Sequence, residues 1–176
     1  MFSRYIFKVK CGPANGGKTS YFLNNIICNK KFIVSIFDKK YIVPLNMSLD
    51  DFDSKCTYIN LFDMKCSFDY DSETCICVDE VHFFNENHLD LLDSFLKLFT
   101  NLNLYFTMLP QSHCNTLLNH SISLLSNAND LIMIKTKCKN CSQDTIQSSC
   151  INNDLTDELF FGKSSFITLC KSCKQF

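Results

Sequence analysis

The chain has 176 residues, of which 46% are hydrophobic and 20% are charged, and its formal net charge is -1. This length suits a single domain with a core of its own, and the composition excludes a disordered tail and a polybasic nucleic-acid binder. The apolar runs are only as long as strands, and the N-terminal segment lacks the features of a signal peptide. We therefore expect a cytoplasmic protein with neither nucleic acid nor a membrane among its partners.

Short apolar segments rich in β-branched and aromatic residues alternate with segments of helical spacing. They predict five buried strands, over Tyr5–Cys11, Phe32–Phe37, Thr74–Val78, Leu104–Leu109 and Leu131–Thr136. Apolar residues at helical spacing predict helices over Lys18–Cys28 and Glu86–Thr100. Strands that alternate with helices indicate an α/β fold with a doubly wound parallel sheet. Residues 46–73 are polar, acidic and poorly periodic, which predicts a loop.

A glycine-rich loop joins the first predicted strand to the first predicted helix. Its sequence GPANGGKT fits the phosphate-binding pattern GxxxxGK[ST], and it contains three of the four glycines in the chain. In such a P-loop the backbone amides hold phosphate oxygens, the lysine reaches the terminal phosphates and the hydroxyl binds magnesium. The alternative is a strand-to-helix turn that binds nothing. The residues predicted to hold ATP are Gly12, Pro13, Ala14, Asn15, Gly16, Gly17, Lys18 and Thr19.

Two acidic residues follow the strand predicted over Thr74–Val78. In nucleotide-binding proteins an aspartate at this place holds magnesium opposite the phosphate loop, so Thr19 and Asp79 are the predicted magnesium ligands. Glu80 lies beside the metal ligand and is the predicted acceptor of a substrate proton. A solvated strand end is the alternative. The tetrapeptide DEVH at 79–82 is also similar to the DExH box of helicases, but so short and nearly neutral a chain lacks their second lobe and basic tracks.

Two pairs of cysteines mark the last part of the chain. Cys138 and Cys141 are separated by two residues, Cys170 and Cys173 likewise, and 28 residues (142–169) lie between the pairs. This spacing predicts a structural zinc site closed by four thiolates. The alternatives are a chance cluster in a chain of 12 cysteines or a redox pair. We thus expect a P-loop domain over residues 1–136 and a small zinc-binding segment over 137–176, with the other eight cysteines as core thiols.

Taken together and in order, these motifs resemble the type II thymidine kinase family over nearly the whole chain. GPANGGKT is similar to the family's GPMFSGKS/T, DKKY at 38–41 to its DxRY, and VDEVHFF at 78–84 to its IDEGQFF. The resemblance implies transfer of the γ-phosphate of ATP to the 5′-hydroxyl of thymidine, or of deoxyuridine or deoxycytidine, in a homotetramer or dimer. It implies ATP, Mg²⁺ and Zn²⁺ as cofactors. It makes Glu80, Lys18 and Lys40 catalytic and adds Asp38, Lys40 and His82 to the nucleotide-binding residues.

The resemblance also implies a lasso-like loop between the cysteine pairs that closes over the nucleoside. The substrate-binding residues that it implies are His113, Asp157, Glu158, Leu159, Phe160, Phe161 and Phe166. The segment LPQSH at 109–113 differs from the family's LDxTF, and Lys40 replaces an arginine whose bidentate phosphate contact it cannot make. Two alternatives therefore remain: a catalytically lapsed or repurposed ATP-binding zinc protein of the same fold, and an ATPase that acts on partners through its cysteine segment.

Overall fold

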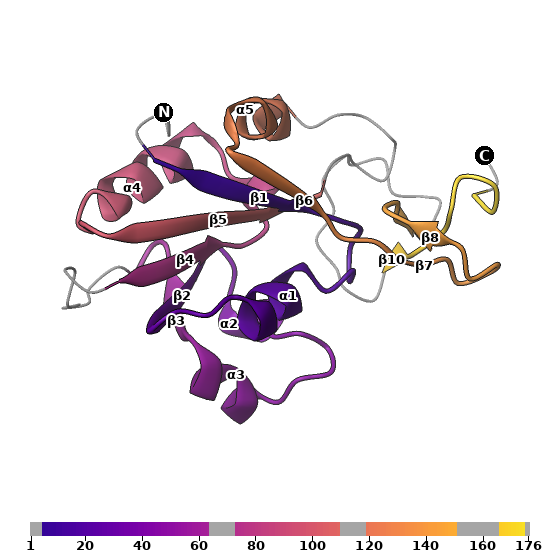
Figure 1. Ribbon diagram of the computed structural model, residues 1–176, viewed down its shortest axis with the longest axis horizontal. Helices are drawn as coiled ribbons and strands as arrows, with labels where there is room; N and C mark the ends of the chain where they lie inside the picture. Colours follow the sequence, from indigo (N-terminus) through magenta and orange to yellow (C-terminus); the bar gives the residue numbers. More distant parts are fainter. Residues whose placement is uncertain (1–4, 64–72, 110–118, 151–165, 175–176) are drawn as a thin grey trace.

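The computed structural model describes residues 5–63, 73–109, 119–150 and 166–174. Their main feature is a six-stranded parallel sheet with the strand order β3-β2-β4-β5-β1-β6 (Figure 1). The strands are β1 (Phe7–Cys11), β2 (Lys30–Ser35), β3 (Thr57–Asn60), β4 (Thr74–Val78), β5 (Leu102–Met108) and β6 (Asp130–Met133). The five predicted strands are therefore confirmed, with ends that differ by one or more residues for all but β4.

Helices cover both faces of this sheet, as the doubly wound prediction requires (Figure 1). They are α1 (Lys18–Asn25), α2 (Lys39–Ile42), α3 (Leu49–Lys55), the 3-10 helix η1 (Val81–Phe83), α4 (Glu86–Leu96) and α5 (Asn119–Asn127). On one face, Leu92 and Phe95 of α4 pack with Phe106 of β5. On the other face, Phe22 of α1 packs with Cys77 of β4. Neighbouring strand residues alternate between these two cores because successive side chains of a strand point to opposite faces.

Residues 46–73 do not form the continuous loop that their polar sequence predicts, because α3 and β3 lie within them. Ser48 caps α3: its side chain accepts a hydrogen bond from the backbone N–H of Asp51 at 3.1 Å. Of the seven residues of α3, only Phe52 is buried. One core residue in so short a helix leaves no apolar period to detect, so the pattern of the sequence could not predict it.

A short segment of antiparallel structure follows β6. It consists of two small hairpins, β7 (Thr136–Lys137) with β8 (Asp144–Thr145), and β9 (Ser149–Cys150) with β10 (Phe166–Ile167). The first cysteine pair lies between β7 and β8, and the second follows β10. None of the helices in the described ranges has the length and apolar character that a membrane span requires.

Lys10 is an unusual member of β1, because its side chain is fully buried under α1. Its Nζ lies 3.8 Å from the centre of the Tyr21 ring and 5.0 Å from that of Tyr105, and it makes no hydrogen bond to a described residue. Burial lowers the pKa of Lys10 from 10.5 to about 8, although the nearby Cys77 thiol opposes the shift. The two aromatic faces thus take the place of water around this cation.

The replacement Lys10→Met is expected to change how stability depends on pH. Below about pH 8 the lysine is charged in both states, and its burial costs stability. Between about pH 8 and pH 10.5 the unfolded chain binds more protons, so wild-type stability rises with pH, whereas the methionine variant lacks this rise. Urea denaturation of both proteins across this range measures the difference. A constant difference between them would contradict the assignment.

Candidate active site

The phosphate loop is folded into its binding shape by contacts of its own. Gly17 has a φ of 81°, which glycine adopts without strain, and Asn15 has a φ of 58°. A side chain at Gly12 would meet the carbonyl oxygen of Ile134, 2.9 Å from the added Cβ. Lys18 is buried, and its Nζ donates a hydrogen bond to the carbonyl of Pro13 at 3.2 Å. This conformation suits a loop whose backbone amides bind phosphate.

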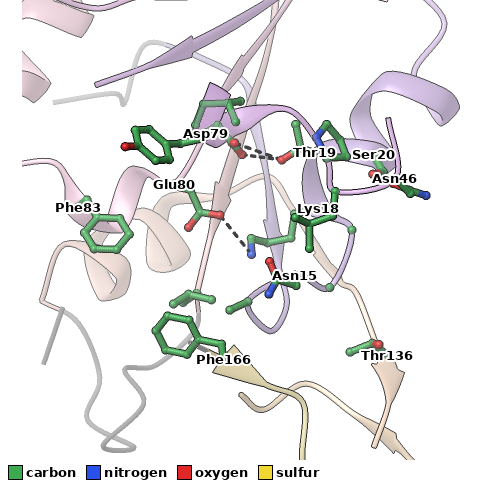
Figure 2. A pocket seen from close by; sticks show the side chains of 18 of the residues that line it. Asn15, Lys18, Thr19, Ser20, Asn46, Asp79, Glu80, Phe83, Thr136 and Phe166 are labelled. Atoms are coloured by element: carbon green, nitrogen blue, oxygen red, sulfur yellow. Dashed lines mark hydrogen bonds and ion pairs between the residues drawn. The ribbon is translucent and has the colours of Figure 1, made fainter. Parts of the chain in front are cut away.

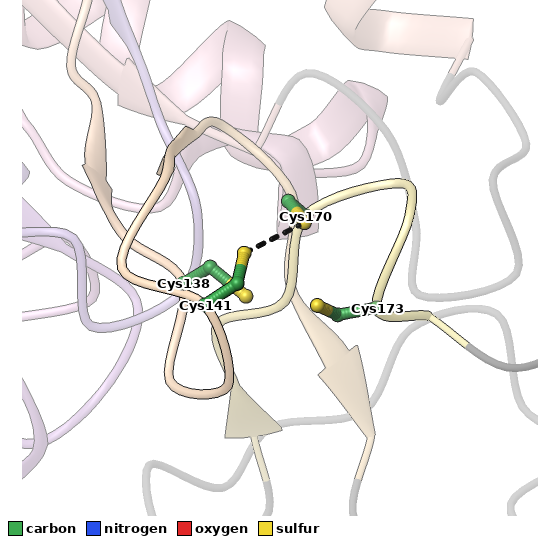
Figure 3. A group of neighbouring side chains, drawn as sticks. All are labelled: Cys138, Cys141, Cys170 and Cys173. Carbon is green, nitrogen blue, oxygen red and sulfur yellow. Dashed lines mark hydrogen bonds between the residues drawn. The ribbon is translucent and has the colours of Figure 1, made fainter.

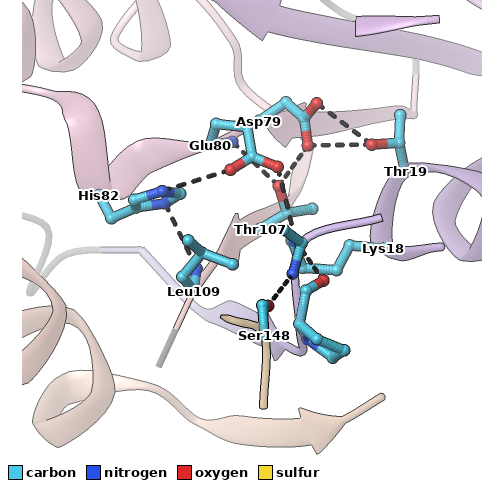
Figure 4. A network of polar contacts seen from close by, with 10 residues as sticks. Lys18, Thr19, Asp79, Glu80, His82, Thr107, Leu109 and Ser148 are labelled. Atoms are coloured by element: carbon cyan, nitrogen blue, oxygen red, sulfur yellow. Dashed lines mark hydrogen bonds and ion pairs between the residues drawn. The ribbon is translucent and has the colours of Figure 1, made fainter. Parts of the chain in front are cut away.

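The predicted magnesium ligands meet at the carboxyl edge of the sheet. The Oγ1 of Thr19 lies 3.2 and 3.1 Å from the two carboxylate oxygens of Asp79, which is itself buried (Figures 2 and 4). A hydroxyl and a carboxylate are oxygen donors of the kind that Mg²⁺ prefers, and the charge of Asp79 is held away from water. The residues present therefore fit a magnesium ion, which Thr19 and Asp79 could hold.

Thr107 connects Asp79 to the backbone of Glu80, and the sequence did not predict this role. Its hydroxyl donates a hydrogen bond to Asp79 and accepts one from the backbone N–H of Glu80 at 3.0 Å (Figure 4). It reaches both because β5 lies between β4 and β1, and Val78 of β4 pairs with Phe106. The one available signal was a polar residue in the apolar run LYFTM of β5.

Glu80 lies between Lys18 and His82, and these three residues with Thr19, Asp79 and Thr107 form a polar cluster. Its Oε1 lies 3.5 Å from Nζ of Lys18, and its Oε2 lies 3.4 Å from Nε2 of His82 (Figure 4). Its backbone has a φ of 54° and a ψ of 41°, the left-handed region that a residue with a side chain rarely adopts. Such strain costs on the order of 1 kcal/mol and is typical of residues whose position matters to a site. The turn after β4 thus directs this carboxylate toward the phosphate loop.

A cavity of about 480 Å³ opens beside this cluster (Figure 2). Its polar wall is the phosphate loop with the acidic pair, and aromatic and aliphatic side chains form much of the rest. The lining residues are Ala14, Asn15, Gly16, Gly17, Lys18, Thr19, Ser20, Tyr41, Ile42, Pro44, Leu45, Asn46, Asp79, Glu80, Phe83, Leu109, Lys135, Thr136 and Phe166. A mixed polar and apolar cavity of this size is typical of a site for a small organic ligand.

Several residues predicted for the site lie elsewhere. Asp38 and Lys40 are exposed, their charged groups are 3.8 Å apart, and neither belongs to the described lining of the cavity. His82 is buried behind Glu80. Phe166 lines the cavity as predicted, whereas Lys135, Phe83 and several other lining residues were not predicted. Further predicted residues lie outside the described part of the chain: His113, Asp157, Glu158, Leu159, Phe160 and Phe161.

The four paired cysteines converge, although 28 residues (142–169) separate the pairs. All four Sγ atoms lie within 4.8 Å of one another, and those of Cys141 and Cys170 are 3.4 Å apart (Figure 3). A zinc ion with bonds of about 2.3 Å to four thiolates places the sulfurs about 3.8 Å apart, which this cluster matches. Backbone amides, first that of Cys170, lower the pKa of the Cys138 thiol to about 6 and so favour the thiolate that binds metal.

A comparison with protein families agrees with this geometry. The sequence profile described as thymidine kinase matches residues 6–174, which is nearly the whole chain. The chain belongs to the thymidine kinase family. This finding confirms the resemblance carried by the phosphate loop, the acidic pair and the cysteine pairs, and it supports a nucleoside kinase activity in broad terms. A search of curated proteins finds no match.

Within this thymidine kinase fold, the charged form of Asp79 is destabilised because the side chain is buried. Burial is the main cause that raises the pKa of Asp79 from 3.8 to about 6, and the neighbouring Glu80 charge adds to it. Its hydrogen bonds with Thr107 and Thr19 and the charge of Lys18 act in the opposite direction. A cation held by Thr19 and Asp79 would offset this destabilisation.

The replacement Asp79→Asn is therefore expected to stabilise the metal-free protein at pH 7.5. Above about pH 6 the wild type carries the buried charge, whereas the asparagine does not. As the pH falls from about 6 toward 3.8, the folded wild type takes up the proton and the difference shrinks. Thermal melting of both proteins at pH 7.5 and pH 5 without magnesium measures the effect. A variant that melts at or below the wild-type temperature at pH 7.5 would contradict it.

Proposed function

We propose that this protein transfers the γ-phosphoryl group of ATP to the 5′-hydroxyl of a pyrimidine deoxynucleoside, with thymidine as the first candidate. One observation carries the proposal: Lys18, Thr19, Asp79 and Glu80 line the same cavity as several aromatic and aliphatic side chains. The polar wall suits the polyphosphate and the reacting hydroxyl. Phe83, on the apolar side, suits the base, since aromatic rings pack on planar bases.

Each residue of the polar wall has a separate part in the proposed reaction. The backbone of the phosphate loop binds the polyphosphate, and Lys18 offsets the negative charge that develops on the transferred group. Thr19 and Asp79 would hold a magnesium ion, which would supply positive charge to offset that of the phosphates. Glu80 accepts the proton of the 5′-hydroxyl as the new P–O bond forms and the bond between the γ-phosphorus and ADP breaks. Most of the rate enhancement then comes from positioning and electrostatics.

Among the residues predicted to be catalytic, Lys40 differs from Lys18 and Glu80 in its position. Its side chain is 66% exposed, and it lies outside the described lining of the cavity. Lys135 is the other lysine beside Lys18 in that lining. A role for Lys40 in offsetting phosphate charge stays a prediction, which Lys40→Ala tests against Lys39→Ala as the neighbouring control.

The experiment that tests the function uses zinc-loaded protein with labelled ATP, magnesium and a panel of thymidine, deoxyuridine and deoxycytidine. Nucleoside monophosphates are then separated from ATP and free phosphate. A labelled monophosphate supports the proposal and identifies the base. ATP binding without any monophosphate would instead support a repurposed ATP-binding zinc protein. Phosphate release that is equal with and without nucleoside would support the ATPase.

A further inference from the structure

His82 has an environment that a nucleotide ligand does not explain. It lies on η1 directly after the acidic pair, and only 2% of its surface is exposed. Its ring packs on Phe83, with the ring centroids 4.3 Å apart, and Phe83 in turn lines the cavity. The resemblance placed His82 among the nucleotide-binding residues, but it does not belong to the described lining of the cavity. Its polar atoms instead face two protein groups.

Those two groups determine which ring nitrogen carries the proton. The Nδ1 of His82 accepts a hydrogen bond from the backbone N–H of Leu109 at 3.3 Å, so this nitrogen is unprotonated (Figure 4). Burial lowers the pKa of His82 to about 4, which keeps the ring neutral near pH 7. A neutral ring with an unprotonated Nδ1 has its proton on Nε2. The donor of His82 is therefore Nε2–H.

Glu80 is the acidic group beside Nε2. The distance from Nε2 to Oε2 of Glu80 is 3.4 Å, and Nε2 has no hydrogen bond within the described residues. A buried donor without an acceptor is unfavourable, so a rotation of the carboxylate that completes a hydrogen bond from Nε2–H would stabilise the site. The other oxygen of Glu80 faces Lys18 and the cavity. The two carboxylate oxygens thus have different neighbours: one a neutral donor, the other a cation beside the phosphate loop.

We propose that His82 is a positioning residue for Glu80, which it holds through Nε2–H so that the other carboxylate oxygen, on the side of Lys18, is directed at the acceptor hydroxyl. This inference rests on the proposed function, since it assigns a purpose to the orientation of the proposed base. The hydrogen bond from the Leu109 amide also holds the His82 ring next to the cavity, because Leu109 is one of the lining residues.

The first test compares His82→Leu with His82→Gln. Leucine fills a similar space without polar atoms, whereas the glutamine amide can accept from Leu109 and donate to Glu80. We expect His82→Leu to lower kcat by about 10- to 100-fold, because misdirection of a reacting group has an effect of this size. The KM for ATP should stay within about twofold of wild type, and His82→Gln should recover most of kcat. Equal kcat values for the two variants would overturn the proposal.

A second test needs no turnover, so its result separates this proposal from the proposed function. In the zinc-loaded full chain labelled with ¹⁵N-histidine, comparison with His82→Gln assigns the signals of His82 among the four histidines. We expect a protonated Nε2 and an unprotonated Nδ1, with a shift at Nε2 when Glu80→Gln is introduced. A protonated Nδ1, or an Nε2 signal unchanged by Glu80→Gln, would overturn the contact even in a protein that phosphorylates no nucleoside.

Discussion

Replacement of Glu80 by glutamine is expected to lower kcat for nucleoside phosphorylation by about 10²–10⁴-fold, the usual contribution of a general base. The amide keeps the size of the side chain and a hydrogen-bonding oxygen, but it cannot take up the proton of the 5′-hydroxyl. Because Glu80 is not a proposed magnesium ligand, binding of magnesium and ATP should survive. Removal of the Glu80 charge should favour the charged form of Asp79, since that charge is one cause of the raised pKa of Asp79.

The measurement is steady-state turnover with the best nucleoside of the panel, together with an independent titration of ATP affinity. Glu86→Gln is a matched control, because Glu86 is an exposed acid at the start of α4, outside the described cavity. Wild-type turnover in Glu80→Gln would refute the assignment of Glu80 as base. A loss of ATP affinity equal to the loss of turnover would instead mean that Glu80 contributes to nucleotide binding.

Removal of zinc is expected to abolish turnover while much of the parallel sheet remains folded. In small zinc sites the metal contributes about 10–16 kcal/mol of apparent binding free energy, and the hairpins β7–β8 and β9–β10 are too short to be stable by themselves. Two contacts connect this segment to the site. Ser148 accepts a hydrogen bond from the backbone N–H of Ala14 in the phosphate loop at 2.7 Å, and Phe166 lines the cavity. Loss of the cluster should release both.

A chelator titration followed by turnover, zinc content and limited proteolysis measures this effect. We expect new cleavage sites within residues 136–174 and recovery of turnover when zinc is restored. Cys170→Ser should behave like the chelated protein. Cys28→Ser serves as the matched control, because Cys28 is a free, partly buried thiol outside the cluster. A purified protein without zinc but with full turnover, or activity that follows thiol oxidation instead of metal content, would favour the redox alternative.

The sequence by itself determined the features that depend on a short, continuous stretch of residues. Apolar patterns revealed β1, β2, β4, β5, β6, α1 and α4. All of these except β6 bury a face or stripe, whereas the apolar residues of β6 are largely exposed in the described structure. The phosphate loop was predictable because its function needs glycine and lysine at a fixed spacing. The cysteine pairs were predictable for the same reason, since tetrahedral zinc limits the spacing of its ligands. These features were enough to identify the family and most of the polar wall of the site.

Contacts between side chains that are distant in the sequence depend on the tertiary structure. Thr107 reaches Asp79 because β5 is inserted between β4 and β1, and no local pattern encodes that strand order. His82 faces Glu80 because the chain takes a left-handed turn after β4. Lys40 lies in a motif that suggests phosphate contact, yet α2 leaves its side chain in solvent. Spacing along the chain specifies which residues are present, whereas register, crossover order and backbone turns determine which of them come together.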